Sequence, residues 1–316
     1  MSFKKKVMIA AIYAVLVCVT VVAGIATRGF IEILRNPFEQ AEGFEMNEIE
    51  ETNGNAKVNV LIVGVDKTEG LSDVIMVVRY DEEHNRIAAM SIPRDTYVNY
   101  KGTRLVNSVY GSGGIDAVSK VVTQLTGLKI NYYVQFNVGT FGKLVDLLGG
   151  VEFNVPQNMN YDDPVQDLHI HLKKGMQTLN GKDAESMVRF RGYPQADLKR
   201  VEVQQDLLKE LIKQKLSVEY VLKIPSIYSS IKDDIKCNIS VGDMAKYGKS
   251  MLSLDLSNGI YTCTMPTMFT GVDAHLYPAK TETDKIMEKE FFAEGPIIGN
   301  KPYNDEPAEE NTTTTE

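Results

Sequence analysis

Two aspartates and one arginine stand at the ends of apolar runs, where extended strands can bring them together. Asp66 and Asp73 lie between the runs 58–65 (VNVLIVGV) and 74–80 (VIMVVRY), and Arg94 follows a third, shorter run at 86–91 (RIAAMS). Connections this short favour antiparallel neighbours, because a parallel return needs about a dozen residues or more. We therefore predict a meander that delivers all three charged side chains to one end of a sheet.

This grouping suits a divalent cation and a phosphate. Mg²⁺ is typically held by one or two carboxylates together with waters and substrate phosphate oxygens. Arginine binds phosphate through a bidentate fork of N–H groups. An aspartate beside a strand also commonly forms a turn, so turn formation stands as the alternative for Asp66 and for Asp73.

A second charged group lies in the second half of an otherwise acidic chain. It contains three arginines within twelve residues, namely Arg189, Arg191 and Arg200. If 189–191 is extended, its two guanidinium groups point to one face, and Gln204 lies one helical turn after Arg200. The pattern indicates a site for several phosphates. The alternative is a solvated basic loop paired with Asp197 and Glu202.

Other residues suited to metal or redox chemistry give weaker signals. His169 and His171 would face one side of a strand (LHIHL), but the spacing places no third zinc ligand. Three cysteines are too few for a disulfide scaffold. Pairing of Cys237 with Cys263 outside the cell stays open, because sequence alone supplies no geometry.

The first segment is predicted to anchor the chain in a cell membrane. Residues 7–27 form 21 residues without a formal charge, and about 20 helical residues span a bilayer core. Three lysines precede this run, so the positive-inside rule places a tail, 1–6, in the cytoplasm and the rest of the chain outside, as a single-pass protein. A cleaved signal peptide is the alternative, and either one exports the domain.

Between two polar segments we predict one exported globular domain. Residues 28–57 read as an acidic linker, 58–292 as the domain, and 293–316 as a tail that is expected to be disordered. The chain has 316 residues and a formal net charge of −8. This balance argues against nucleic-acid binding through a basic surface.

The middle of the domain alternates strands and helices. The patterns predict a helix at 113–126 that stops at Gly127, a strand at 132–138, a helix at 140–148 and a strand at 151–155. The strand–helix–strand order implies a parallel pair added to the meander. The fold class is therefore α/β, with a mixed central sheet flanked by helices in an α-β-α sandwich.

Eight stretches in order resemble the LytR-CpsA-Psr family of cell-wall glycopolymer ligases. They fall between about residues 58 and 216 and read LIVGVD, SDVIMVV, SIPRDT, LVNSVYGSGG, YYVQFNVGTF, LVDLLGGVEFNV, GMQTLNGKDAESMVRFR and DLKRVEVQQ. No single stretch is decisive, whereas eight in the right order make a strong match. One anchor helix before an exported domain is also similar to this family.

The resemblance implies a reaction and a set of site residues. Members bind a polyprenyl-pyrophosphate-linked glycan, with the pyrophosphate near Mg²⁺ and arginines, and transfer the phosphoglycan to a peptidoglycan hydroxyl. By motif, Asp66 and Asp73 are the implied Mg²⁺ ligands, and Asp66, Asp73 and Arg94 the implied catalytic group. The implied pyrophosphate contacts are Arg94, Arg104, Arg189, Arg191, Arg200 and Gln204.

Three positions depart from the family pattern. Leu71 occupies a position where family members often have an arginine before the Ser-Asp pair. Arg104 lies close to a position where they commonly have a lysine, and Val203 replaces their usual arginine before the glutamines. The departures keep two alternatives to transfer open. One is a non-catalytic exported module that binds polyprenyl phosphate or wall polymer, and the other is a lipid pyrophosphatase. A membrane-bound regulator of gene expression is disfavoured, because few residues precede the predicted anchor.

Overall fold

The structure is a computed structural model that describes residues 44, 47–52, 54–65, 70–163, 168–193, 196–269 and 275–293. The predicted membrane segment 7–27 and the predicted tail beyond residue 293 lie outside these residues. None of the helices in the described ranges is long and apolar enough to cross a membrane.

A mixed sheet forms the centre of the fold. Its strands follow in the order β12, β7, β2, β3, β4 and β13, and β1 pairs with β2. Their bounds are β1 Glu50–Thr52, β2 Asn55–Val65, β3 Ser72–Asp81, β4 Arg86–Ser91, β7 Tyr132–Phe136, β12 Lys236–Cys237 and β13 Ile260–Thr264. β2, β3 and β4 are antiparallel to their neighbours in the meander, as the short connections predict.

Two parallel pairings make the sheet mixed. β7 lies beside β2 after the crossover helix α2 (Val106–Thr126), and β13 lies beside β4 at the other edge. The predicted mixed sheet flanked by helices is confirmed, but the parallel pair expected from the strand at 151–155 is wrong. That strand, β8 (Val151–Val155), pairs antiparallel with β11 (Gly175–Leu179). It alternates buried and exposed residues, whereas a central parallel strand is buried on both faces.

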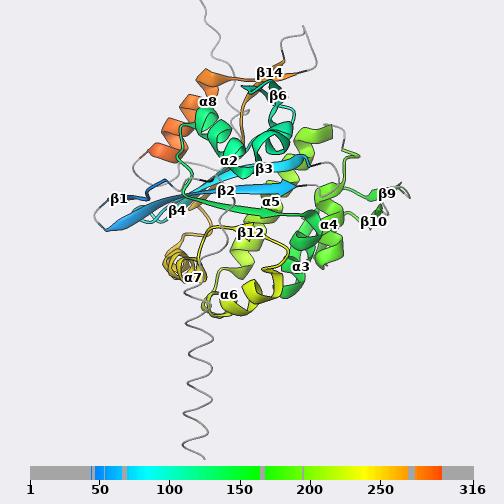
Figure 1. Cartoon of the computed structure of the whole chain (residues 1–316). Helices are drawn as coiled ribbons and strands as arrows, with labels where there is room; N and C mark the ends of the chain where they lie inside the picture. Colours follow the sequence, from blue (N-terminus) through cyan, green and yellow to red (C-terminus); the bar gives the residue numbers. More distant parts are fainter. Residues whose placement is uncertain are drawn as a thin grey trace, which may run out of the picture.

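Small hairpins border the central sheet. Besides the pair β8 and β11, the described residues form three further two-stranded sheets, which pair β5 with β6, β9 with β10, and β14 with β15. Their bounds are β5 Tyr97–Tyr100, β6 Thr103–Leu105, β9 Met159–Asp163, β10 Leu168–Leu172, β14 Thr267–Phe269 and β15 Leu276–Pro278. In Figure 1, β9 and β10 project at one end of the sheet, and β6 and β14 lie near the top of the molecule, on the same side of the sheet as α2.

Helices lie on both sides of the sheet (Figure 1), with α2 and α8 on one side and α6 and α7 on the other. The remaining helices have the bounds α3 Val138–Leu147, α4 Gly181–Arg189, α5 Ala196–Lys215, α6 Val218–Ile231, α7 Val241–Ser250 and α8 Lys280–Ile286. A 3₁₀ turn, η1 (Met251–Ser253), follows α7, and a π-helical segment, η2 (Met287–Phe292), follows α8.

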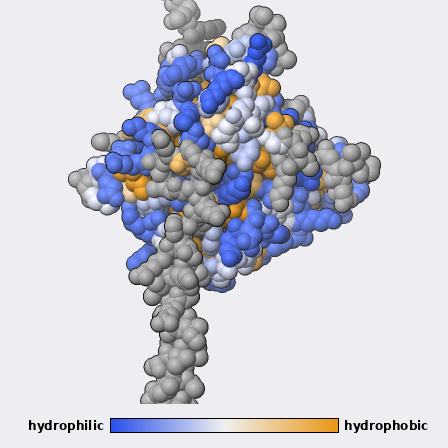
Figure 2. Space-filling model, in the orientation of Figure 1, coloured by the Kyte–Doolittle hydropathy of each residue, from blue (hydrophilic) through white to orange (hydrophobic). Residues whose placement is uncertain are grey.

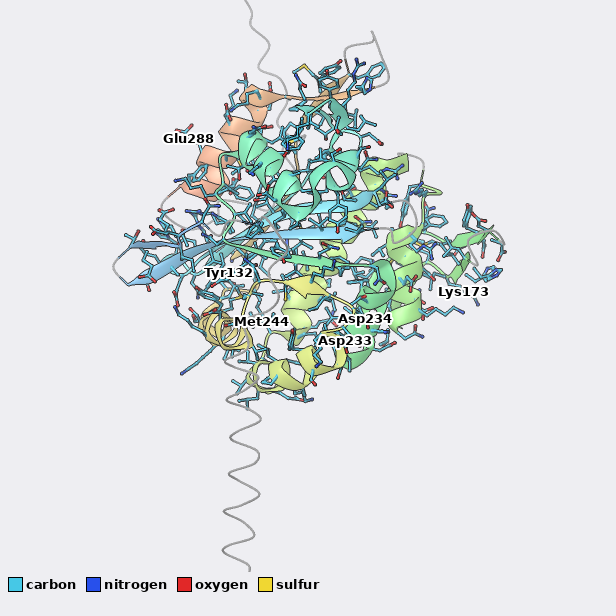
Figure 3. The ribbon with its side chains drawn as sticks, viewed as in Figure 1. Tyr132, Lys173, Asp233, Asp234, Met244 and Glu288 are labelled. Carbon is cyan, nitrogen blue, oxygen red and sulfur yellow. The ribbon has the colours of Figure 1, made fainter. Side chains whose placement is uncertain are left out.

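Three apolar clusters form the core. The first lies between the sheet and α2, α8 and η2. The third covers the opposite face, where Tyr132 and Met244 point into the space between β7 and α7 (Figure 3). The second cluster lies apart from the central sheet and joins β8 to β11 with α4 and α5. The segment that carries the arginines therefore has a core of its own.

Helix α2 begins seven residues before the predicted start at residue 113. Gly113 and Gly114 depart from helical backbone angles, and Gly114 has φ 64° and ψ −154°. This region of backbone conformation is essentially restricted to glycine. The glycine pair therefore bends the helix rather than starting it. The predicted stop at Gly127 is confirmed by its left-handed φ of 77° and its N–H donation to the Thr123 carbonyl.

The open question of a disulfide is answered against pairing. Cys237 and Cys263 are both free. They lie on β12 and β13, the two edges of the sheet, and five strand spacings separate these edges by roughly 24 Å. A disulfide requires Cα atoms within about 7 Å of each other. Burial raises the pKa of each thiol to about 12, so neither is a reactive thiolate at neutral pH.

Candidate functional site

A tight turn directly after β4 presents Arg94. The backbone N–H and the hydroxyl of Thr96 both donate to the Pro93 carbonyl, at 3.0 and 2.6 Å. The N–H groups of Val106 and Asn107, at the start of α2, donate to the carbonyls of Thr96 and Arg94 at 3.0 and 3.1 Å. The first N–H groups of a helix find no partner within the helix. The turn and α2 therefore hold each other in place.

Asp73 lies at the start of β3 and contacts Arg94. Nη1 of Arg94 donates to Oδ1 of Asp73 at 2.8 Å, and Oδ2 of Asp95 lies 3.7 Å from Arg94 Nε. The exposed fractions of the Arg94 and Asp73 side chains are 24% and 33%, so solvent reaches both. The buried Ser72 hydroxyl donates to the Asn107 carbonyl at 3.2 Å and fixes the backbone beside Asp73. The meander thus brings the two side chains together at one end of the sheet.

Asp66 lies outside the described residues, so its role stays a prediction. β2 ends at Val65, and the register between β2 and β3 shifts by a bulge between Gly64 and Val65. Val65 pairs with Ser72. The chain therefore leaves β2 at the same end of the sheet that holds Asp73.

The first two arginines of the second group differ from their predicted arrangement. Arg189 is the last residue of α4, so the expectation of an extended 189–191 is wrong at this residue. Nη1 of Arg189 lies 3.3 Å from a carboxylate oxygen of Glu185, which stands one helical turn earlier on the same face. Arg191 follows the helix and is exposed.

Arg200 lies on α5 with only 4% of its surface exposed. A solvated basic loop is therefore wrong for this arginine, because a buried guanidinium must be matched by nearby polar groups. Gln204 lies one turn further along α5, and its Nε2 donates to the Val188 carbonyl at 2.9 Å. This bond ties the helix that carries Arg200 to the helix that carries Arg189.

Gln205, which the sequence analysis did not single out, joins α5 to the central sheet. Its Nε2 donates to the Cys263 carbonyl at 2.7 Å and to the Thr264 hydroxyl at 3.1 Å. Thr264 pairs with the last residue of β4, three residues before Arg94. Because a helix rises 1.5 Å per residue, Arg200 lies only about 7–8 Å along α5 from Gln205. Gln205 therefore fixes α5, which also carries Arg200, to the strand that pairs with β4.

Arg104 is the remaining predicted pyrophosphate contact. It lies on β6, in the hairpin that follows the Arg94 turn, and its side chain is exposed. Of the five predicted arginines, Arg104 and Arg191 are exposed, Arg94 and Arg189 are half-buried and Arg200 is buried.

Tyr193 adds a hydrogen-bond donor that the sequence analysis missed. Its ring packs edge-on against Phe190, with 5.0 Å between ring centroids. Burial raises the pKa of the Tyr193 hydroxyl to about 12, so the hydroxyl keeps its proton at neutral pH. The hydroxyl is buried and has no hydrogen-bond partner among the described residues. Such a donor costs about 1–3 kcal/mol when it is left unsatisfied, and a ligand oxygen can satisfy it.

The described part of the site fits Mg²⁺ through Asp73. No group of three or more His, Cys, Asp or Glu side chains within the described ranges could hold a metal ion. Mg²⁺ needs only one or two protein carboxylates when a substrate supplies phosphate oxygens. Asp73 offers a partly exposed carboxylate next to a phosphate-binding arginine, which is the donor chemistry that such a site requires.

The histidine pair has a structural partner. Nδ1 of His169 and Nε2 of His171 lie 2.6 and 3.3 Å from the same carboxylate oxygen of Asp162. The hydrogen bond to His169 lowers the pKa of Asp162. The three side chains are exposed on the β9–β10 hairpin, so they stabilise the hairpin rather than any part of the Arg94 region.

Comparison with known proteins gives the family. The LytR_cpsA_psr family matches residues 34–291 of the chain. The protein belongs to this family. The resemblance found in the eight sequence stretches is therefore confirmed, and the match extends beyond them through β13, β14, β15 and α8.

Known members of the LytR_cpsA_psr family are similar over most of the chain. The regulatory protein MsrR of Staphylococcus aureus (strain COL) is 28% identical over 253 residues, which cover 76% of either chain. The polyisoprenyl-teichoic acid–peptidoglycan teichoic acid transferase TagU of Bacillus cereus is 28% identical over 232 residues, which cover 70% of this chain and 74% of TagU. The crystal structure of TagV from B. subtilis has a TM-score of 0.64 at 24% identity and covers 73% of this chain and 94% of TagV.

Proposed function

We propose that this protein transfers a glycan phosphate from a polyprenyl-pyrophosphate carrier to a hydroxyl of peptidoglycan. The contact between Arg94 and Asp73 at the end of the sheet carries the proposal, because it places a phosphate-binding cation beside a carboxylate that solvent reaches. Membership of the LytR_cpsA_psr family supports it, as does the name of TagU, a teichoic acid transferase that acts on peptidoglycan.

The roles of the residues follow from charge and position. The forked N–H groups of Arg94 would bind oxygens of the pyrophosphate, with Arg189 and Arg200 approaching from α4 and α5. In the reaction, an acceptor hydroxyl oxygen forms a bond to the phosphorus next to the glycan. The bond from this phosphorus to the bridging oxygen breaks, and polyprenyl phosphate leaves with the electron pair. The acceptor hydroxyl gives up its proton to water. Catalysis of this kind depends mainly on positioning and on stabilising charge.

Asp73 and Asp66 are the residues that would hold Mg²⁺. The ion, when bound, offsets negative charge on the pyrophosphate. Asp73 also orients the Arg94 guanidinium through the 2.8 Å contact. The buried hydroxyl of Tyr193, four residues after Arg189 in the chain, would donate to an oxygen of the donor substrate.

We also propose the place where this reaction occurs. A single-pass anchor at 7–27, with residues 1–6 in the cytoplasm, would hold domain 58–292 outside the membrane. There, a lipid-linked donor in the bilayer and a wall acceptor are both within reach.

The test is a transfer assay with the purified full-length chain. Lipid-linked glycan, a peptidoglycan acceptor and Mg²⁺ are supplied, and the covalent glycan–peptidoglycan product is quantified by mass spectrometry. We expect Arg94→Ala to lower the transfer rate by about 100–1000-fold, as loss of one charge-stabilising donor does in other enzymes. Lys173→Ala is the matched control, since it removes a cation that is exposed on the linker after β10 (Figure 3). Equal rates for the Arg94 variant and the wild type would contradict the assigned role.

A second candidate function is a non-catalytic module that holds the polyprenyl carrier. The departure at Val203 favours it, because this side chain is 2% exposed and packs in the core beneath α5, where it contributes no cation. The same assay separates the candidates. Binding of the lipid carrier without product, across several acceptors, would support the binding module, and release of free glycan phosphate to water would support a lipid pyrophosphatase.

A further inference from the structure

A hollow of about 220 Å³ lies between β5 and the second half of α2. Its lining residues are Tyr97, Val98, Asn99, Val121, Gln124 and Leu125. Val98 and Val121 are buried and form its base, whereas Asn99 and Gln124 are exposed at its edge. The hollow therefore has an apolar base, an aromatic side and two amides at the opening.

The aromatic side of the hollow continues onto the β14–β15 hairpin. The ring of Tyr97 lies against Tyr277 with 4.7 Å between centroids, and the His275 ring stands edge-on to Tyr97 at 5.5 Å. On the same hairpin, Met268 and Phe269 are 49% and 66% exposed. Hydrophilic and hydrophobic residues are mixed on the face seen in Figure 2. Two exposed large apolar side chains next to each other on one hairpin form a small apolar patch that suggests binding.

The hollow adjoins the Arg94 turn. Tyr97 comes three residues after Arg94, a separation of at most about 10 Å along the chain. Thr96, which closes the turn on Pro93, also forms a parallel bridge with Leu276 of β15. The turn that presents Arg94 and the side of the hollow are therefore parts of one rigid unit. A ligand made of several linked units can fill the hollow and extend to Arg94.

We propose that this hollow binds one sugar ring of the acceptor glycan. The inference rests on the proposed transferase function, and it assigns a binding site to the acceptor, for which no site has yet been named. The electron-rich face of a tyrosine attracts the weakly positive C–H groups on the flat side of a sugar. An amide both donates and accepts hydrogen bonds, as sugar hydroxyls and acetamido groups require.

The size and charge of the hollow select a sugar over other ligands. One water takes up about 30 Å³ of liquid volume, and pockets for drug-sized ligands start near 300 Å³, so a volume of about 220 Å³ suits a single ring. All six lining side chains are uncharged, which suits a neutral ring better than a phosphate. Two amides at the opening suit a lipid chain poorly, because they would lose hydrogen bonds to water.

The test measures glycan binding and transfer separately. The probe is a β-1,4-linked tetramer of N-acetylglucosamine, titrated by calorimetry into the full-length chain. Hydrogen exchange locates the bound tetramer. We expect protection of peptides that cover 97–105 and 115–126. We also expect at least tenfold weaker binding in the double variant Asn99→Ala/Gln124→Ala. Both side chains are exposed, so the variant keeps its fold.

Asn160→Ala is the matched control, because Asn160 is an exposed amide on β9 outside this unit. It should bind the tetramer as the wild type does. In the transfer assay, the double variant should raise the KM for the glycan acceptor and leave the affinity for the lipid-linked donor unchanged.

Unchanged binding of the tetramer by the double variant, or protection confined to other peptides, would overturn the proposal. So would protection of 97–105 and 115–126 by polyprenyl phosphate and not by the tetramer. Failure of the transferase function would appear differently, as absence of product from a chain that still binds the tetramer at the hollow.

Discussion

Two arginines of the same meander, Arg79 and Arg94, occupy opposite ends of the sheet and differ in burial and in the backbone that carries them. Arg79 lies within β3 with 5% of its side chain exposed, donates to Asn59 Oδ1 at 3.1 Å and lies 3.3 Å from Glu50. Its guanidinium also stacks over the Phe292 ring at 5.4 Å. Arg94 lies in a turn, is 24% exposed and has a partly exposed carboxylate partner.

Burial separates the structural cation, Arg79, from the candidate functional cation, Arg94. The Arg79 guanidinium lies between the first described strand and the last described helix and bonds to the buried Asn59, although its other partner, Glu50, is 58% exposed. Arg94 keeps its charge near solvent, and a phosphate oxygen can join or replace the carboxylate of Asp73. Mutations should therefore affect stability at one end of the sheet and chemistry at the other.

The largest effect on stability should come from Arg79→Met. This change leaves the buried Asn59 Oδ1 without its donor and removes the stacking over Phe292. We expect the free energy of unfolding to fall by about 2–4 kcal/mol, measured by urea denaturation. Transfer activity per folded molecule should stay close to the wild-type value. An unchanged unfolding midpoint would show that burial does not make Arg79 structural.

A smaller effect should come from the bend in α2, which supports the Arg94 end. Gly114→Ala places a Cβ at φ 64° and ψ −154°, and such strain costs about 1–3 kcal/mol. Gly111→Ala is the matched control on the same helix, since its added Cβ meets only ordinary contact, at 3.6 Å from the Gly70 carbonyl. There we expect a gain of about 0.5–1 kcal/mol. Thermal unfolding of both variants checks the opposite signs, and equal signs would contradict the role of the bend.

The smallest effect on stability should come from the functional pair itself. Arg94→Ala and Asp73→Ala should each lower the free energy of unfolding by less than about 1 kcal/mol, because both side chains reach solvent. A double-mutant cycle should give a coupling of about 0.2–1 kcal/mol that decreases with added salt. A salt-independent coupling several times larger would place Arg94 with Arg79 among the structural cations.

The meander could be predicted from sequence because its information is local. Runs of β-branched residues with short connections leave few arrangements, and β4 was predicted with its observed bounds, Arg86–Ser91. The same local rule placed Asp73 and Arg94 at one end of the sheet. Pairing between distant segments carries no such local signal, so the partner of β8 was predicted wrongly, and the parallel β13 was not assigned to the sheet.

Other features depend on contacts that no pattern in the sequence specifies. The first turns of α2 contain Asn107, Ser108 and Gly111, which favour helix weakly. Carbonyls of the Arg94 turn compensate by accepting the N–H groups of Val106 and Asn107, the first two residues of the helix. Gln205 falls on the buried side of α5 four residues after Val201. A polar residue on an apolar stripe is a signal that could have identified it as a link to another element.

The position of β13 has a consequence for biosynthesis. This strand, Ile260–Thr264, covers the edge of β4, and it also accepts the hydrogen bonds that hold α5 in place. A growing polypeptide that ends before residue 260 would expose the β4 edge as an open template for pairing with other chains. Assembly of the arginine groups must therefore wait until most of the polypeptide has left the ribosome, and premature termination in this last part should give aggregates rather than a partly active protein.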